Sequence, residues 1–367
     1  MRKEPLIHHA IIRAADAERV RSDTASLIER ADGTLLVAYH SYSKGPEGGG
    51  DFGAARIYLA ESVDGGITWI RERMVADISP GDLNVMSPFL SRFGDEILLG
   101  YVRNHSGADT SMYLHRSRDG GRTFGPSTPI WEHAGEYRIQ GGASSLVLLD
   151  SGRLVLPVQS CAEVWVPEEN QIIRTWSSDD GGWHWTESAN RIQLPLRGAM
   201  EPSVAQRSDG SLLMSMRTQL GAVFFAESSD GGETWSRARV SGLASPESCT
   251  CLRRIPGTED LVLFWNDSEY VPDHHHFGIR SPLSAARSRD GGRTWTKIGD
   301  IDTGDFMMTN LGCTFLASGT AIVTYLKTPD PEIVGGVYRG SFSTKAERDS
   351  VFRMELQAAL IPRSWFD

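Results

Sequence analysis

Several features that mark particular classes of protein are scarce or missing in this sequence. Its 367 residues include four cysteines, Cys161, Cys249, Cys251 and Cys313, and none forms a C-x-x-C pair, which argues against a zinc ribbon. No run of about 18 apolar residues occurs, so we expect no membrane-spanning segment and no membrane partner. The N-terminal segment lacks the apolar stretch of a signal peptide, and we therefore expect a cytoplasmic protein.

Positive charge is also scarce. The formal net charge is −10, from 37 Lys and Arg residues against 47 Asp and Glu residues. Nucleic-acid binding needs a basic surface, so we expect no nucleic-acid partner. A local group of arginines inside an acidic protein would still bind a small anionic molecule. Neither charge nor composition indicates an oligomeric state.

What the sequence does contain is an internal repeat. One motif, a serine followed by Asp-Gly-Gly and an aromatic residue, occurs five times, with its aspartates at Asp64, Asp119, Asp180, Asp230 and Asp290. The intervals between them are 55, 61, 50 and 60 residues. Such a period is typical of propellers, whose blades each contain four strands. Since five copies cannot all form one active site, we interpret these aspartates as structural supports of a turn.

A second repeat counts six units. A short turn followed by an apolar strand begins at Ala31, Phe93, Asp150, Ser208, Gly257 and Ala317. The last unit lacks only the aspartate motif. The segment 6–13 has the pattern of a strand that would complete the last unit and close a ring. The sequence therefore predicts an all-β fold, a six-bladed β-propeller formed by residues 1–367 as a single domain. Near the C-terminus, residues 344–347 resemble a helix capping box, but 351–360 also fit a final strand.

The five aspartate motifs resemble those of the bacterial sialidase superfamily, also called Asp-box or BNR-repeat proteins. The resemblance covers essentially the whole chain. It implies a sialidase-like propeller that removes a terminal sugar from a small or oligosaccharide substrate without a cofactor. In this family three arginines bind the substrate carboxylate, an aspartate acts as acid and base, and a tyrosine assisted by a glutamate attacks the sugar.

Four residues fall at positions where the resemblance places functional groups. Glu201 opens the first strand of the fourth unit and Arg217 ends the second, so the two side chains should lie close together. Arg280 precedes the strand that leads into the fifth Asp box, and arginine suits bidentate binding of a carboxylate. Asp51 lies in a glycine-rich loop 11 residues before the first Asp-box serine. A pKa raised by burial would let Asp51 protonate a leaving oxygen.

Two positions depart from the family pattern. Asp23 stands where the first arginine is expected, and Asn310 stands where the nucleophilic tyrosine is expected. The reversed charge at Asp23 favours a neutral sugar over sialic acid. Without the tyrosine, Asp51 would act as acid, with Glu201 or Asp23 as base or nucleophile. Carboxyl groups about 5–5.5 Å apart would indicate retention of configuration, and about 6.5–9.5 Å inversion.

Other polar residues are weaker candidates for the cleft. By blade symmetry, the strand-end residues Asn84, Arg103 and Gln159 should point into it, where such groups would recognise sugar hydroxyls. His275 and His276 lie in a loop of three histidines that leads to Arg280, and we expect them to bind substrate. Adjacent residues rarely converge on one ion, so we predict no metal site.

Three functions fit these residues. The leading prediction is a sialidase-like exo-glycoside hydrolase that is not a standard sialidase. A polysaccharide lyase would instead use a histidine of the 274–276 loop, with Arg217 and Arg280 neutralising a uronate. A carbohydrate-binding propeller without catalysis would explain the missing tyrosine.

Overall fold

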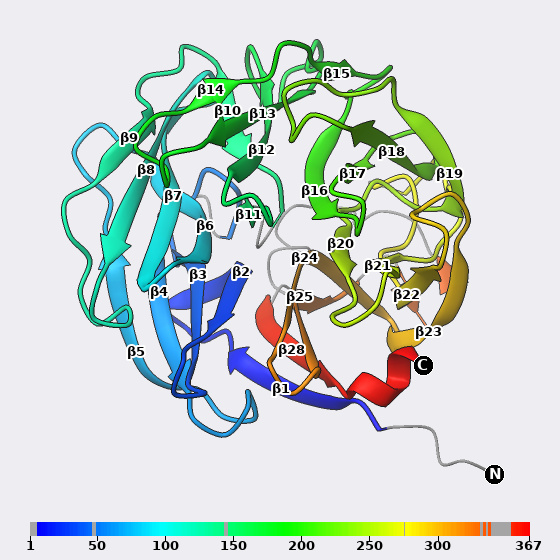
Figure 1. Ribbon diagram of the computed structural model, residues 1–367, viewed down its shortest axis with the longest axis horizontal. Helices are drawn as coiled ribbons and strands as arrows, with labels where there is room; N and C mark the ends of the chain where they lie inside the picture. The colour runs from blue at the N-terminus through cyan, green and yellow to red at the C-terminus, as the bar shows by residue number, and fades with distance from the viewer. Residues whose placement is uncertain are drawn as a thin grey trace.

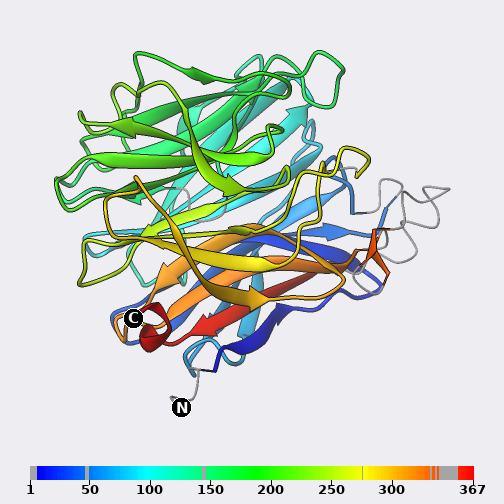
Figure 2. The same ribbon diagram turned by 90° about the vertical axis from the view of Figure 1, so that its right-hand side faces the viewer.

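The computed structural model describes residues 6–45, 49–142, 146–274, 276–330 and 354–367, and the backbone of a short hairpin, β26 (Ile333–Val334) with β27 (Val337–Tyr338). Six antiparallel sheets follow one another around a ring (Figure 1). Seen from the side, the ring has two distinct faces, each formed by the turns and loops at one end of the strands (Figure 2). The predicted six-bladed propeller is thereby confirmed.

The first three blades are built in chain order, from the centre of the ring outwards. Blade one contains β2 (Arg19–Glu29), β3 (Leu35–Ser43), β4 (Ala55–Ser62) and β5 (Ile70–Ala76). Blade two contains β6 (Asn84–Phe93), β7 (Glu96–Ser106), β8 (Asp109–Ser117) and β9 (Thr128–Trp131). Blade three contains β10 (Tyr137–Gln140), β12 (Leu154–Cys161), β13 (Ile172–Ser178) and β14 (Thr186–Glu187), with β11 (Val147–Leu148) on β12 and β15 (Ile192–Gln193) on β13.

The other three blades repeat this plan, except at the end of the chain. Blade four contains β16 (Met200–Gln206), β17 (Leu212–Arg217), β18 (Ala222–Ser228) and β19 (Arg239–Ala244). Blade five contains β20 (Cys251–Arg254), β21 (Leu261–Asn266), β22 (Leu283–Ser288) and β23 (Thr296–Asp302). Blade six contains β24 (Phe306–Phe315), β25 (Ala321–Pro329), β28 (Glu355–Ile361) and β1 (His8–Arg13), and a 3₁₀ turn, η1 (Arg363–Phe366), follows β28.

The sixth blade joins the two ends of the chain. Its outer strand β1 pairs antiparallel with β28, with His8 opposite Leu360. In blades one to five the Asp-box turn connects the third and fourth strands. In blade six these strands, β28 and β1, come from opposite ends of the chain, so no turn connects them. The missing sixth Asp box has this topological reason. Of the two C-terminal alternatives, 354–361 forms a bridge and a strand, and 344–347 lies outside the described residues.

The core is divided into clusters between neighbouring blades. Leu36 and Leu59 of blade one pack with Leu90 and Leu99 of blade two, and similar clusters fill the other five interfaces, including that between blades six and one. The aromatic residue of each Asp box joins the cluster between its own blade and the preceding one: Trp69, Phe124, Trp185, Trp235 and Trp295. The Asp-box rings therefore pack between neighbouring blades.

The Asp boxes are tight hydrogen-bonded turns. In the fifth box the Asp290 carboxylate accepts from the Ser288 hydroxyl (2.8 Å), the Thr294 amide (2.9 Å) and the Thr294 hydroxyl (2.6 Å). These bonds, led by that from the Thr294 hydroxyl, lower the pKa of Asp290 to about 2. The glycines supply the left-handed backbone of the turn, with φ of 69° at Gly291 and 87° at Gly292. The Asp boxes therefore act as structural supports, as predicted.

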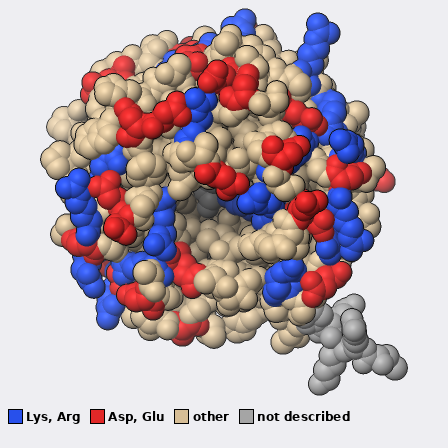
Figure 3. All heavy atoms as spheres, in the orientation of Figure 1, with Lys and Arg blue, Asp and Glu red and all other residues tan. Residues whose placement is uncertain are grey.

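Strand register separates the Asp boxes from the candidate site. In blade four, Leu212 pairs with Ser228 of the Asp box at one end of the sheet. Met200 pairs with Arg217 at the other end. The Asp boxes therefore lie on one face of the ring, while Glu201 and Arg217 lie towards the other. Acidic and basic side chains are interspersed on the face drawn in Figure 3, around a central hollow. Within the described residues, no helix has the length and apolar character needed to span a membrane.

Candidate active site

A cavity of about 850 Å³ lies in the ring at the end where the inner strands begin. All six blades contribute to its wall, through the first residues of the inner strands and through the loops that join second to third strands. The volume is in the range of pockets that enclose a small ligand.

A repeated backbone irregularity directs side chains into this cavity. In blades one, two, four and six the inner strand loses its register near its start, between Asp23 and Ser26 in β2, for example, and between Met200 and Ser203 in β16. Within each bulge one residue has a left-handed backbone: Thr24 (φ 50°), Ser87 (53°), Glu201 (43°) and Asn310 (57°). All four line the cavity. Bulges commonly re-aim side chains beside functional sites, and left-handed non-glycine residues are uncommon and strained.

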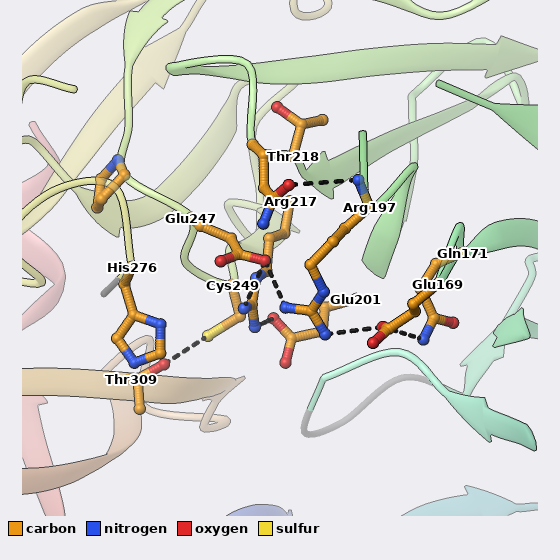
Figure 4. Close-up of polar contacts among 12 residues, drawn as sticks. Glu169, Gln171, Arg197, Glu201, Arg217, Thr218, Glu247, Cys249, His276 and Thr309 are labelled. Atoms are coloured by element: carbon orange, nitrogen blue, oxygen red, sulfur yellow. Dashed lines mark hydrogen bonds and ion pairs between the residues drawn. The ribbon is translucent and has the colours of Figure 1, made fainter. Parts of the chain in front are cut away.

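A chain of alternating charges forms one wall (Figure 4). Glu201 Oε2 lies 3.1 Å from Nη1 of Arg217, whose Nη2 lies 3.1 Å from Glu247 Oε1. Glu247 Oε1 also contacts Nη1 of Arg197 (2.6 Å), and Nη2 of Arg197 contacts Glu169 (2.7 Å). The predicted closeness of Glu201 and Arg217 is confirmed.

The central member of this wall is Glu247, whose side chain is 2% exposed. Burial acts to raise its pKa, but the charges of Arg217, Arg197 and Arg280 outweigh burial and the pKa is lowered. The pKa of Arg217 is raised, because Glu201 and Glu247 outweigh its burial. The wall is therefore a set of fixed charges that hold one another in place.

Arg280 differs from the other arginines of the cavity. Its guanidinium donates to the backbone carbonyl of Glu247 (2.7 and 3.2 Å) and contacts the sulfur of Met307. Among the described residues no carboxylate oxygen lies within 4.0 Å of it. Burial, together with the nearby Arg217, lowers its pKa to about 10. A buried guanidinium that has no carboxylate beside it would be stabilised by an anionic group in the cavity.

Asp51 approaches the cavity from blade one, which lies across the ring from Glu201 in blade four. Its carboxylate lies 2.7 Å from Nη1 of Arg21, and the side chain is 37% exposed, so the burial expected for it is absent. Arg21 also donates to the carbonyl of Gly49 (2.8 Å) and Asn84 donates to the carbonyls of Asp51 (2.8 Å) and Gly53 (3.0 Å). These bonds hold residues 49–53 in place beside the cavity.

The structure corrects three placements. Asp23 does not line the cavity: its side chain is fully buried behind the wall, paired with Arg21 and His40. Asn84 supports the Asp51 loop and does not face the cavity. Arg103 also lies away from it and is paired with Asp82 at 2.5 Å. Blade symmetry failed for Asn84 and Arg103, and the family alignment failed for Asp23, because alternate residues of a strand point to opposite faces and a bulge changes which residue faces the ring centre.

The other predicted site residues that the structure describes line the cavity, among them Gln159, His276 and Asn310. Gln159 accepts a hydrogen bond from the Glu201 amide at 2.5 Å. His275 lies outside the described residues. Its neighbour His274 is buried, with Nε2 3.5 Å from Asp330.

Sequence reasoning missed several residues of the wall. Arg21, Tyr137, Trp165, Arg197 and Glu247 all line the cavity. Most of them stand in loops just before an inner strand or at its first residue. The predicted starts of the inner strands could therefore have identified them as cavity residues. Arg21 is the most important of them, because it places a guanidinium in blade one two residues before Asp23. Burial raises the pKa of Tyr137, which keeps its phenol protonated.

Comparison with known proteins agrees with the repeats and the ring. Residues 33–343 match the family described as BNR repeat-like domain. The chain belongs to this family. No curated protein matches the chain.

Solved structures share the fold of this BNR repeat-like propeller at low identity. A crystal structure of a protein of unknown function from Dyadobacter fermentans is 16% identical, with a TM-score of 0.73 over 96% of this chain and 98% of that one. The Hadza microbial sialidase Hz136 is 20% identical, with a TM-score of 0.69 over 96% and 68% of the two chains. Trypanosoma rangeli sialidase in complex with the inhibitor DANA is 15% identical, with a TM-score of 0.70 over 96% and 59%.

These similarities establish a sialidase-like BNR propeller. They give no support to the lyase or to the non-catalytic alternative. The chain spans only 59% of the length of the trypanosomal sialidase.

Proposed function

We propose that this propeller is an exo-acting glycoside hydrolase that removes a terminal sugar acid. One observation supports the proposal above all: two carboxylates, Asp51 and Glu201, enter one cavity from opposite blades, and each is paired with an arginine of the wall. Most glycoside hydrolases use two carboxyl groups that flank the bound sugar as their catalytic residues.

The proposed reaction assigns different roles to these two groups. Asp51, in the partly exposed loop, protonates the leaving oxygen of the glycosidic bond. Glu201, held by Arg217, either activates a water molecule or attacks the sugar carbon. Asp23, the other base considered from sequence, has no access to a substrate because it does not line the cavity. Asn310 offers no nucleophile at the position where the family has a tyrosine.

The acidic character of the substrate follows from the arginines. Arg280 is buried without a carboxylate partner among the described residues, and Arg217 lies close enough to influence its pKa. A substrate carboxylate placed there would accept charge-assisted hydrogen bonds from a preformed cationic site. The preference for a neutral sugar rested on Asp23, and the burial of Asp23 removes that reason.

The test is an assay of purified protein on aryl glycosides that include an α-sialoside, uronides and neutral hexosides. Asp51→Asn and Glu201→Gln are the site variants, and Asp290→Asn, in an Asp box on the other face, is the matched control. We expect cleavage of an acidic glycoside by the wild type and by the control, but not by the site variants.

Three outcomes would contradict the proposal. Inactivity of the wild type on the whole panel would remove its support. Full activity of both site variants would exclude the assigned carboxylates. An unsaturated product that absorbs in the ultraviolet would indicate elimination, as in a lyase, instead of hydrolysis. When cleavage occurs, the anomeric configuration of the first-formed sugar, followed by NMR, distinguishes attack by Glu201 from attack by water.

A further inference from the structure

A second group of ionisable side chains lies on blade two, outside the cavity. His105 is near the end of β7, Asp109 begins β8, and His133 follows β9. Metal-ligating atoms of these three residues all lie within 4.8 Å of one another. Nδ1 of His133 is 2.8 Å from Oδ2 of Asp109, and the two imidazole rings stack with centroids 4.5 Å apart.

The surroundings of His105 orient its ring in a particular way. Its Nδ1 lies 3.0 Å from Asp82, a carboxylate that is 4% exposed and also paired with Arg103. An Nδ1–H donated to Asp82 leaves the lone pair on Nε2, which lies 2.9 Å from the Ser111 hydroxyl. Histidines that bind metals typically donate their other ring N–H to a carboxylate in this way.

We propose that His105, Asp109 and His133 form a binding site for a divalent transition-metal ion, with zinc as the expected occupant. Two imidazole nitrogens and one carboxylate oxygen suit zinc, and a water molecule would occupy the fourth position. Asp82 contacts Nδ1 of His105 and so orients the ring that carries the ligand atom Nε2. Arg103, which sequence analysis had assigned to substrate, serves here to balance the charge of Asp82.

Binding requires side-chain rearrangement around the three ligands. Zinc bonds to nitrogen and oxygen are about 2.0–2.2 Å long, so the three ligand atoms must draw closer than 4.8 Å. The His133 side chain is 71% exposed, so its ring has room to turn when the ion replaces its hydrogen bond to Asp109. The ion replaces the hydrogen between His133 Nδ1 and Asp109: a protonated imidazolium releases it to solvent, whereas in a neutral imidazole it moves to Nε2. The buried Ser111 side chain must change rotamer, because its oxygen lies 2.9 Å from Nε2 of His105 and accepts the His133 amide at 2.9 Å. Metal affinity should therefore fall in acid.

The site lies beside the rim of the cavity. The turn between His105 and Asp109 contains Gly107, whose carbonyl accepts a hydrogen bond from the amide of Val164 at 2.9 Å. Val164 lines the cavity. A bound ion would fix both sides of this turn and so support the adjacent loop.

The experiment uses the full chain without an affinity tag, treated with a chelator and then dialysed. Calorimetric titration with zinc chloride should show one equivalent bound. Cobalt(II) should give the visible absorption of a tetrahedral site. His133→Ala should weaken zinc binding by more than about 100-fold and abolish the cobalt spectrum, because it removes one of three ligands. Asp82→Asn should weaken binding by about 10–100-fold, since it removes only the support of a ligand.

The matched control is His184→Ala. His184 is another exposed histidine paired with an aspartate, Asp180, but it belongs to an Asp box and, within the described part of the chain, to no such group of three. It should bind zinc like the wild type, and thermal unfolding of all variants checks their folding. Absence of zinc binding by the wild type would overturn the proposal. One equivalent that persists unchanged in His133→Ala would also overturn it and place the ion elsewhere, for example in the 274–276 loop.

Discussion

The two faces of the ring repeat their structure in different ways. On one face, five Asp-box turns share both backbone and side chains: serine, aspartate and two glycines recur with the same hydrogen bonds. On the other, four bulges share the backbone only, and the residues at the equivalent left-handed position are Thr24, Ser87, Glu201 and Asn310. All four of these face one cavity.

The difference separates stability from function. Where side chains repeat together with the backbone, each turn is held by the same local hydrogen bonds. Five such turns together stabilise the ring. Where the backbone repeats and the side chains differ, each blade contributes a different group to one shared space. A strained backbone retained with varied side chains is the expected pattern of a functional site.

The largest expected effect is on activity at the bulged face. Glu201→Gln or Asp51→Asn should lower kcat/KM by about 10²–10⁴-fold, because each removes a proton-transfer group or a nucleophile. The thermal midpoint should change little for Asp51→Asn, whose side chain is partly exposed. Steady-state assays on the acidic glycoside found in the panel, with melting curves for each variant, measure both quantities. A loss of activity that merely follows a loss of folded protein would contradict the assignment.

The next effect concerns stability on the same face. Glu247→Gln leaves Arg197 and Arg217 without their shared carboxylate in a buried position, and should cost about 3–5 kcal/mol of unfolding free energy. Glu233→Gln is the control, because Glu233 is a 59% exposed partner of Arg153 and should cost less than about 1 kcal/mol. Urea unfolding of the three proteins gives the comparison. Equal losses for both variants would show that Glu247 does not organise the wall.

A smaller effect is expected at a single Asp box. Asp290→Asn should lower the unfolding free energy by about 1 kcal/mol, because the lost charge weakens hydrogen bonds in an exposed turn. Its kcat per folded molecule should equal that of the wild type. A large loss of activity with normal stability would contradict the separation of the two faces.

The same variant predicts a pH dependence. The pKa of Asp290 is lowered to about 2, so its stabilising contribution is present above the usual aspartate pKa near 4 and is lost as the pH falls through 2. The stability gap between wild type and Asp290→Asn should therefore shrink between about pH 4 and pH 2. Urea unfolding at pH 7, 4 and 2.5 tests this prediction. A stability gap that widens in acid would contradict a stabilising role for the ionised Asp290 carboxylate.

The smallest effect is expected at a bulge without an assigned chemical role. Ser87→Gly should stabilise the protein by up to about 1 kcal/mol, because glycine adopts φ of 53° without strain. Ser87→Ala, which keeps the Cβ atom, is the control and should give no such gain. Thermal unfolding distinguishes them. If glycine destabilises more than alanine, the left-handed backbone at these bulges is not strained.

Much of the fold could be predicted from sequence because its signals are local. The Asp boxes and the turn-and-strand repeats each depend on residues close together in the chain, which permits counting six blades and identifying the 6–13 strand. The absent sixth box was visible, but its reason, a blade assembled from both chain ends, belongs to the topology.

For the site, the sequence by itself indicated which blades supply Asp51, Glu201, Arg217 and Arg280, because the resemblance to the sialidase superfamily places such groups at set distances from the repeats. Only the tertiary structure decided that Asp23 is buried, that Arg21 lines the cavity on the side of blade one, and that Glu247 pairs with two arginines. Bulges shift which side chain faces the centre of the ring. The group on blade two likewise unites residues 105, 109 and 133 through strand pairing. Such contacts depend on strand register and on packing across the ring, which no local pattern of residues encodes.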